Sequence, residues 1–592
     1  MKKISWTKRI AAGFLALLLW TVQAEASVTM GGDGTVYPEK EHGEVSLDKM
    51  SRDLFDQEAF EEAAEELSSL AEKRGQEKKV RELYQVILEE TDNLYTQYVL
   101  LTLDYYKDVE NEEAARKYEE TGNLLMEAGN TAAETLRDLV NSEFYGQVLR
   151  EEMGPENAAA FAGYESVTPE ESRLTEKEMD LVREYEEALM QDYEDSREEN
   201  QVLGEIYLEL VETRTELARL QGYDNYADYA YECGYYRDYT VEDVERLRES
   251  VKEELVPLYE ACLSYATEQN AGLIFTERET DAEEMLDSLA PVMEKIRPEI
   301  GDAYEYFRSY HLYDIEPDEK KMDMGYTVEL PAYGDAYIYD NSYGTYQDYF
   351  TIIHEFGHFT SVFYEDSHYL YSTVNMDVSE IHSQGMEVLF WPYYEELAPG
   401  MGESMQAYVV FELLSNIITC CIYDEIEQEI YRNPDMSLQE LNQAAEDISS
   451  QYGGDQTLDP YQWVELTHLY QQPLYVISYA TSALAALEIL ELSAEDADQA
   501  LEVYMEISAS GTSRPYCAVL DGCGLRDIFQ EGSLEETAGN IADLLDLTVE
   551  KTDESQEEPP AGGILEQVLA GLEDWAGEIF AGGGRTLWDR LQ

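Results

Sequence analysis

Five consecutive residues near the middle of the chain, His354-Glu355-Phe356-Gly357-His358, restrict its fold more than any other feature. Two imidazoles four positions apart face the same way on an α-helix, where residues i and i+4 share one side. On such a helix they can bind one zinc ion, and the carboxylate of Glu355 can act as general base. Because the chain contains only seven His, this spacing is rarely met by chance.

The residues around this motif predict the helix that it needs. Thr345 and Asp348 have the spacing of a capping box at a helix start. Apolar residues then recur at helical intervals and can hold the imidazoles rigidly: Tyr349, Ile352, Ile353, Phe356 and Phe363. We therefore expect a helix that begins near Thr345 and carries both imidazoles on one face.

A zinc site that activates water uses three protein ligands, so one further donor is required. The metzincin arrangement is excluded, because position 364 is Tyr364 rather than His. The later stretch NMDVSEIHSQGMEVLFW offers Glu380 and Glu387 at i and i+7, with His382 between them. On a helix, His382 points about 200° away from Glu380, so these two side chains cannot bind one metal together.

The motif HEFGH, followed by D-x-x-E-x-x-S-Q and by a further Glu and Trp, resembles the thimet oligopeptidase and oligoendopeptidase F family of zinc metallopeptidases. The resemblance implies one Zn²⁺ per chain, held by His354, His358 and Glu380. It also implies that the neighbouring matches support or pack around the site: Asp377, Ser383, Gln384, Glu387 and Trp391.

Two further segments resemble the same family. LVETRTELARLQGYDNYADYAY is similar to its helical segment before the active site, and HLYQQPLYVISYATSALAALEIL is similar to a segment whose His and Tyr face the bound peptide. This implies catalytic roles for His468, Tyr475 and Tyr479 as hydrogen-bond donors to the oxyanion. Ile477 and Ser482 depart from the Tyr and Gly of many relatives, which leaves the choice between the two tyrosines open. The resemblance covers about residues 176–547.

The resemblance implies a mainly α, large helical peptidase fold that encloses a channel, with a small β element before the HExxH helix. It also implies a zinc-dependent endopeptidase that hydrolyses short oligopeptides. Two alternatives stay open. A zinc carboxypeptidase of helical fold would share HExxH and a later Glu, and an inactive peptide- or zinc-binding protein would keep the ligands, although retention of Glu355 argues against it.

Periodicity along the chain agrees with a mainly α fold. Helical patterns fill about residues 47–142, resume from about Glu176 and continue to about Val549, interrupted by one strand-like segment between Met324 and Tyr343. An exposed strand edge can pair with an extended peptide, and residues 337–341 are the candidates for this edge.

Both ends of the chain carry their own signals. Basic residues precede an apolar run over residues 10–20, and Ala24-Glu25-Ala26 fits a cleavage site, so residues 1–26 are predicted to be a signal peptide of a secreted protein. The remaining chain divides into an N-terminal helical region (27–170), a catalytic zinc peptidase domain (171–550) and an acidic linker with a C-terminal amphipathic helix (551–592).

Composition excludes some partners. The chain has 39 Lys and Arg against 127 Asp and Glu, and a net charge of −88 excludes a nucleic-acid-binding surface and disfavours an anionic membrane. We expect no integral membrane span in the mature chain. The six Cys are too few for a disulfide scaffold. Cys517 and Cys523 are the favoured local pair if a bridge forms, but six buried thiols are the favoured interpretation.

Overall fold

The computed structural model describes residues 40–549, apart from 41, 164–167, 190, 192, 323, 366–367, 372–374, 454–459 and 513. The predicted signal peptide and the predicted linker and C-terminal helix lie outside the described residues. Cleavage, export and the division into domains therefore stay predictions.

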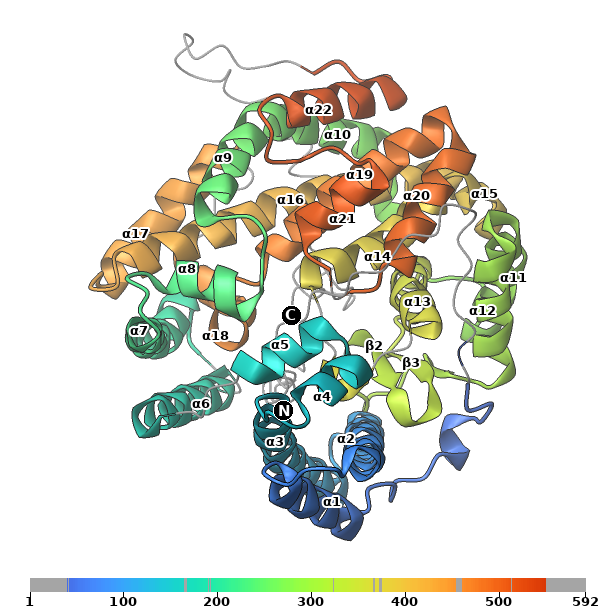
Figure 1. Cartoon of the computed structure of the whole chain (residues 1–592). Coiled ribbons are helices and arrows are strands. Elements are labelled where there is room, and N and C mark those ends of the chain that lie inside the picture. Colours follow the sequence, from blue (N-terminus) through green and yellow to red (C-terminus); the bar gives the residue numbers. More distant parts are fainter. Residues whose placement is uncertain are drawn as a thin grey trace.

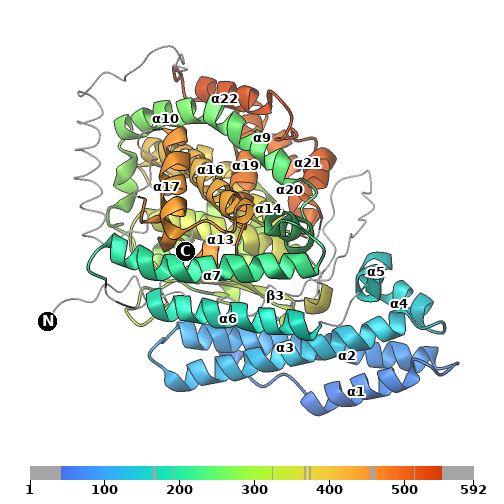
Figure 2. The ribbon, with the colours of Figure 1, turned by 90° about the vertical axis from the view of Figure 1, so that its left-hand side faces the viewer.

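The predicted fold class is confirmed: the described residues are mainly helical, and one small sheet directly precedes the HExxH helix (Figure 1). The N-terminal region consists of α1 (Gln57–Leu70), α2 (Glu77–Tyr106), α3 (Glu112–Val140), α4 (Gly146–Met153) and α5 (Pro155–Gly163). Helices α1, α2 and α3 pack against one another (Figure 2). The starts of α1 and α3 are capped, since the side chains of Asp56 and Asn111 accept hydrogen bonds from free backbone N–H groups.

A second group of helices connects this region to the sheet. It comprises α6 (Pro169–Leu189), α7 (Ser196–Leu220), α8 (Tyr226–Tyr229), α9 (Val241–Ser250), α10 (Val256–Glu268), α11 (Ala282–Ile296) and α12 (Pro298–Ser309). Helices α6 and α7 lie side by side above α3 in Figure 2.

The sheet contains β1 (Tyr313–Asp314), β2 (Gly325–Leu330) and β3 (Asp335–Asp340) in the order β1-β3-β2. Strands β2 and β3 form an antiparallel hairpin, and β1 pairs with β3 in parallel. The prediction that residues 337–341 offer a free edge is wrong, because β3 is the central strand and all six of its residues are buried. The sequence shows that this segment is extended but not which strand has neighbours on both sides.

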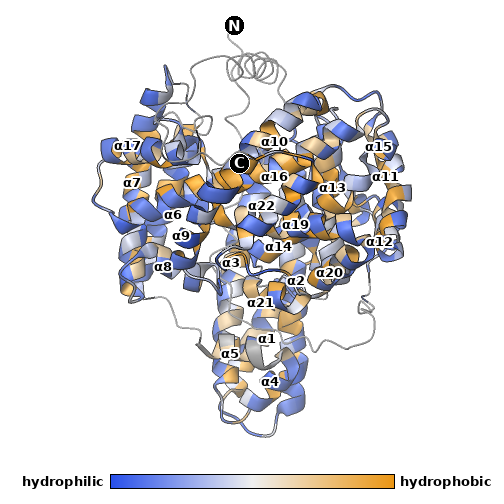
Figure 3. Cartoon of the chain, turned by 90° about the horizontal axis from the view of Figure 1, so that it is seen from above, coloured by the Kyte–Doolittle hydropathy of each residue, from blue (hydrophilic) through white to orange (hydrophobic). Residues whose placement is uncertain are grey.

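The remaining helices form the core around the motif. They are α13 (Gln347–Tyr364), α14 (Met376–Leu389), α15 (Tyr394–Leu397), α16 (Gly402–Arg432), α17 (Leu438–Ser449), α18 (His468–Gln471), α19 (Ile477–Glu495), α20 (Ala497–Ala509), α21 (Tyr516–Cys523) and α22 (Ser533–Leu544). Helix α14 packs between α13 and α19, and α16 packs on α19. Hydrophobic colours are concentrated along α16 and α13 in Figure 3.

The HExxH helix starts in a different way from the predicted capping box. Helix α13 begins at Gln347, and the side chain of its N-cap residue, Tyr346, makes no capping hydrogen bond. The Asp348 carboxylate instead accepts hydrogen bonds from the backbone N–H groups of Tyr343 and Gly344 and pairs with Arg278 at 2.7 Å. Asp348 therefore fixes the turn between β3 and α13.

Two helices of the described part, α16 and α19, are long and apolar enough to cross a membrane by composition. Their apolar windows are 83% and 72% buried inside the protein, as in core helices. All six cysteines are free thiols: four are buried, whereas Cys233 and Cys517 are half-buried. Cys517 and Cys523 form no bridge.

Candidate metal centre

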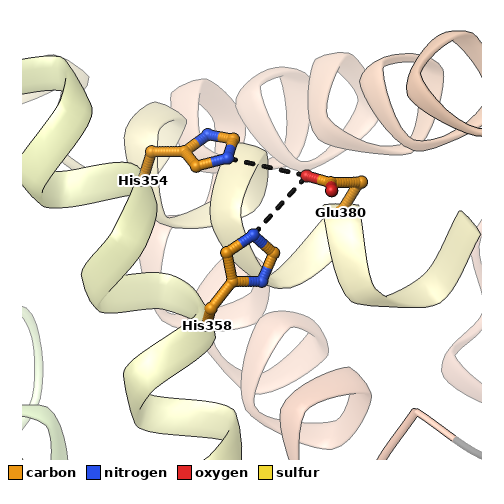
Figure 4. A group of neighbouring side chains, drawn as sticks. All are labelled: His354, His358 and Glu380. Atoms are coloured by element: carbon orange, nitrogen blue, oxygen red, sulfur yellow. Dashed lines mark ion pairs between the residues drawn. The ribbon is translucent and has the colours of Figure 1, made fainter. Parts of the chain in front are cut away.

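Helices α13 and α14 bring together three of the predicted metal ligands. The Nε2 atoms of His354 and His358 each lie 3.6 Å from Oε2 of Glu380, and one donor atom of each residue lies within 4.8 Å of the others (Figure 4). Glu380 comes from α14, on the side that faces the imidazoles. The three side chains thus converge on one point from two helices.

This donor set fits zinc. Bonds of about 2.0–2.2 Å at tetrahedral angles place two ligand atoms about 3.4 Å apart, close to the observed 3.6 Å. Two imidazoles and one carboxylate also leave one of four tetrahedral positions for water or substrate, as catalytic zinc sites require. Nickel, cobalt or manganese accept the same donors, so geometry alone does not select the metal.

Gly357, between the two imidazoles, allows α14 to approach α13. A Cβ at this position would lie 2.3 Å from the carbonyl oxygen of His382 and 2.7 Å from Cα of Ser383. Both contacts are with backbone, which cannot move aside as a flexible side chain can. The absence of a side chain at Gly357 therefore sets the distance at which Glu380 meets the imidazoles.

Neighbouring side chains orient the three ligands. Oε1 of Glu387 lies 2.7 Å from Nδ1 of His354, which leaves Nε2 to face the metal position. Burial opposes protonation of His354, but the hydrogen bond and charge of Glu387 raise its pKa. The hydroxyl of Ser383 donates to Oε2 of Glu380 at 3.0 Å. Burial alone would raise the pKa of Glu380, but His358, His354 and this hydroxyl lower it to about 2.

His382, considered in the sequence as an alternative donor, lies outside this group. Its side chain is fully buried, and the group of three possible ligands does not include it. Burial lowers the pKa of His382 to about 3, so the imidazole is neutral.

The carboxylate of Glu355 is held by a contact that the sequence did not reveal. Thr327 of β2 donates from Oγ1 to Oε2 of Glu355 at 2.7 Å and lies 2.9 Å from its carbonyl oxygen. Glu355 is 7% exposed. Because Thr327 precedes the motif by 28 residues and belongs to no recognisable pattern, only the packing of β2 on α13 brings the two together.

The aromatic residues predicted to bind the oxyanion form one cluster. The rings of His468 and Tyr475 stack at 5.4 Å, and Tyr479 stands edge-on to both. The phenol of Tyr475 lies 3.5 Å from Oε1 of Glu380, which links this cluster to the ligand set. Burial lowers the pKa of His468 to about 4, so its ring is neutral and one nitrogen can donate.

The model of peptidase family M3 matches residues 272–539, which contain the three ligands, Glu355 and the aromatic cluster. Over this segment, which is a little under half of the chain, the protein is similar to peptidase family M3. The resemblance found in the sequence is thereby confirmed.

Known proteins similar to the chain include oligopeptidase PepF of Bacillus subtilis (strain 168), which is 25% identical over 272 residues. That match covers 43% of this chain and spans only 39% of the length of the relative. A structure described as a candidate oligoendopeptidase F has 21% identity and a TM-score of 0.71, and it covers 85% of this chain and 99% of its own. The structure of PZ peptidase A with an inhibitor has 20% identity and a TM-score of 0.69, and the match covers 85% of this chain and 99% of that one. These two structures show the common fold.

Within the M3 segment, Asp377 anchors the ligand helix α14 to α19. Its carboxylate accepts hydrogen bonds from Tyr239 and Thr481, and Arg237 lies 3.6 Å away. All four side chains are buried. Because Asp377 lies one turn before Glu380, this network fixes the first turn of the helix that carries the third ligand.

Proposed function

We propose that this chain is a zinc-dependent endopeptidase that hydrolyses short oligopeptides. The observation that carries the proposal is the convergence of His354, His358 and Glu380 beside the buried carboxylate of Glu355. The similarity of residues 272–539 to peptidase family M3 supports it. Export of the mature chain, predicted from residues 1–26, is part of the same proposal.

His354, His358 and Glu380 would hold the zinc, which when bound would polarise the scissile carbonyl and make the attacking water more acidic. Glu355 accepts the proton of the attacking water on its carboxylate and later transfers it to the nitrogen of the leaving amine. Thr327 donates to one oxygen of this carboxylate, so the other oxygen is available for the proton. The hydroxyl thereby fixes the orientation of the base.

His468, Tyr475 and Tyr479 can donate hydrogen bonds to the carbonyl oxygen as it becomes negative. The neutral ring of His468 and the two phenols are all donors at neutral pH, because burial raises the pKa of both tyrosines. Donors held in place before the reaction need no rearrangement as charge develops, and loss of one such donor costs about 100- to 1,000-fold in kcat.

We assign the peptide-binding edge to β2 rather than to β3. Strand β2 is at the end of the sheet order, so its outer edge can accept an extended peptide by backbone hydrogen bonds. Thr327 lies on this strand and contacts Glu355, so a peptide on β2 would pass beside the base. An extended substrate agrees with the channel that the family resemblance implies.

The test is to incubate the purified chain with an unlabelled peptide of about a dozen residues and to map the products by mass spectrometry. We expect internal cleavage, its loss with a zinc chelator and its return with added zinc. Stepwise release of single C-terminal residues would instead show a carboxypeptidase. Zinc binding without cleavage would show an inactive binding protein.

A variant and a second substrate sharpen this test. Glu355→Gln should keep near-stoichiometric zinc and lose hydrolysis, because an amide fills the same space and cannot accept the proton. Loss of zinc together with activity would show that Glu355 is structural. A stable globular protein offered beside the peptide should stay intact, and its rapid fragmentation would rule out a channel.

A further inference from the structure

Two buried ionisable side chains that the chemistry above does not use lie against one segment of backbone. Arg214 of α7 is 1% exposed and Glu427 of α16 is fully buried. Both contact residues 468–477, the segment that runs through α18 and into the start of α19. A buried charge is costly unless it is paired or hydrogen-bonded, so these contacts need a reason.

Arg214 holds the first half of this segment. Its guanidinium donates to the carbonyl oxygens of Leu469 and Tyr470, the former at 2.9 Å. The same side chain donates to Glu178 of α6 at 2.6 Å, which balances its charge. The carbonyls of Leu469 and Tyr470 cannot be satisfied by the backbone four residues on, because Pro473 has no N–H and the N–H of Leu474 donates to Glu427; the guanidinium supplies the missing donors.

Glu427 holds the second half. Both of its carboxylate oxygens lie 2.9 Å from the backbone nitrogen of Leu474, which donates to them. Leu474 has φ +64°, a left-handed conformation that is unfavourable for a non-glycine residue. Burial raises the pKa of Glu427 well above its usual range, so an uncharged side chain with the same acceptor can replace it.

A third contact lies between these two. The phenol of Tyr235 donates to the carbonyl oxygen of Pro473 at 2.8 Å. Side chains from three separate parts of the chain therefore hydrogen-bond to the backbone of four residues within one short segment.

The ends of this segment carry two of the proposed oxyanion donors. His468 begins α18, and Tyr475 directly follows the strained Leu474. Their rings stack, and the phenol of Tyr475 reaches Glu380. Donors act well only if their direction is fixed to within about 0.5 Å and 10–20° before the substrate binds.

We propose that Arg214, Glu427 and Tyr235 are positioning residues that hold residues 468–477 in the conformation in which His468 and Tyr475 face the scissile carbonyl. This inference rests on the proposed peptidase function. The three residues belong neither to the candidate metal ligands nor to the proposed oxyanion donors, and they act through the backbone that they bind.

Tyr235→Phe is the mildest test, because it removes one hydroxyl and keeps the ring. Loss of this one hydrogen bond should lower kcat by about 2- to 10-fold and leave KM and bound zinc unchanged. Tyr145→Phe is the matched control, since this buried tyrosine also donates to a backbone carbonyl, that of Lys73, in the N-terminal helices. It should leave kcat unchanged.

Glu427 offers a pair of variants with opposite expectations. Glu427→Gln keeps an acceptor for Leu474 and should keep kcat within about 2-fold of wild type, whereas Glu427→Met removes the acceptor and should lower kcat by about 10-fold or more. Equal kcat for Glu427→Met, Tyr235→Phe and wild type would overturn the proposal. Equal loss in Glu427→Gln and Glu427→Met would also overturn it.

Amide hydrogen exchange separates this proposal from the function on which it rests. In Tyr235→Phe and Glu427→Met, a peptic fragment that covers residues 468–477 should exchange faster than in wild type, with fragments of α1 to α3 unchanged. Unchanged exchange would overturn the proposal even in an active enzyme. If the wild-type chain hydrolyses no peptide, the proposed function fails, and exchange alone then decides whether these side chains hold the segment.

Discussion

Replacing Gly357 by Ala tests whether the close contact of α13 with α14 sets the metal site. An added Cβ would lie 2.3 Å from the His382 carbonyl oxygen, and real Cβ atoms essentially never come within 3.0 Å of such an atom. The backbones must therefore separate by at least the difference, about 0.7 Å. Overpacking of this kind destabilises a fold by about 1–3 kcal/mol.

The same shift should weaken metal binding. Glu380 lies two residues before His382 on the displaced helix, and metal–ligand distances tolerate changes of only about 0.2 Å. We expect the Kd for zinc to rise by about 10- to 100-fold, measured by competition with a chromophoric chelator. Gly539→Ala in α22 is the control: its Cβ meets nothing within 4 Å, so zinc affinity should not change. Wild-type affinity in folded Gly357→Ala would refute the reasoning.

Three further predictions concern the same region. Thr327→Val should lower kcat by about 10-fold with zinc content unchanged, because Glu355 loses a charge-assisted hydrogen bond. Thr327→Ser keeps the hydroxyl and should keep the wild-type kcat. Equal kcat for wild type and both variants would show that this hydrogen bond does not contribute to catalysis. Tyr475→Phe and Tyr479→Phe should each be assayed, since removal of the hydroxyl that reaches the substrate oxygen should lower kcat by about 10- to 1,000-fold. Wild-type kcat in both variants would show that the aromatic cluster serves only for packing. Burial raises the pKa of Glu365 to about 7, so the folded carboxyl keeps a proton that the unfolded chain releases above about pH 4.3. The free energy of unfolding should therefore fall from about pH 4.5 to 7, and Glu365→Gln should reduce this slope in denaturant titrations.

The sequence by itself predicted the candidate ligands that local periodicity can reveal. His354 and His358 share a face because they are four residues apart on a helix, and the resemblance to a family with a second motif singled out Glu380 over Glu387. The helical class follows from the same periodicity, and the aromatic residues after His468 follow from a longer matched segment. Each of these inferences needs only residues close together in the chain.

Tertiary structure decided what depends on neighbours distant in sequence. In the sheet order β1-β3-β2, strand β3 is central and β2 lies at one edge, although both strands have the same extended pattern in the sequence. Thr327 meets Glu355, and Arg214 meets the backbone before Leu474, across 28 and 255 residues. No periodicity encodes such contacts, because hydrogen bonds between side chain and distant backbone depend on how helices pack, and packing is a property of the whole fold.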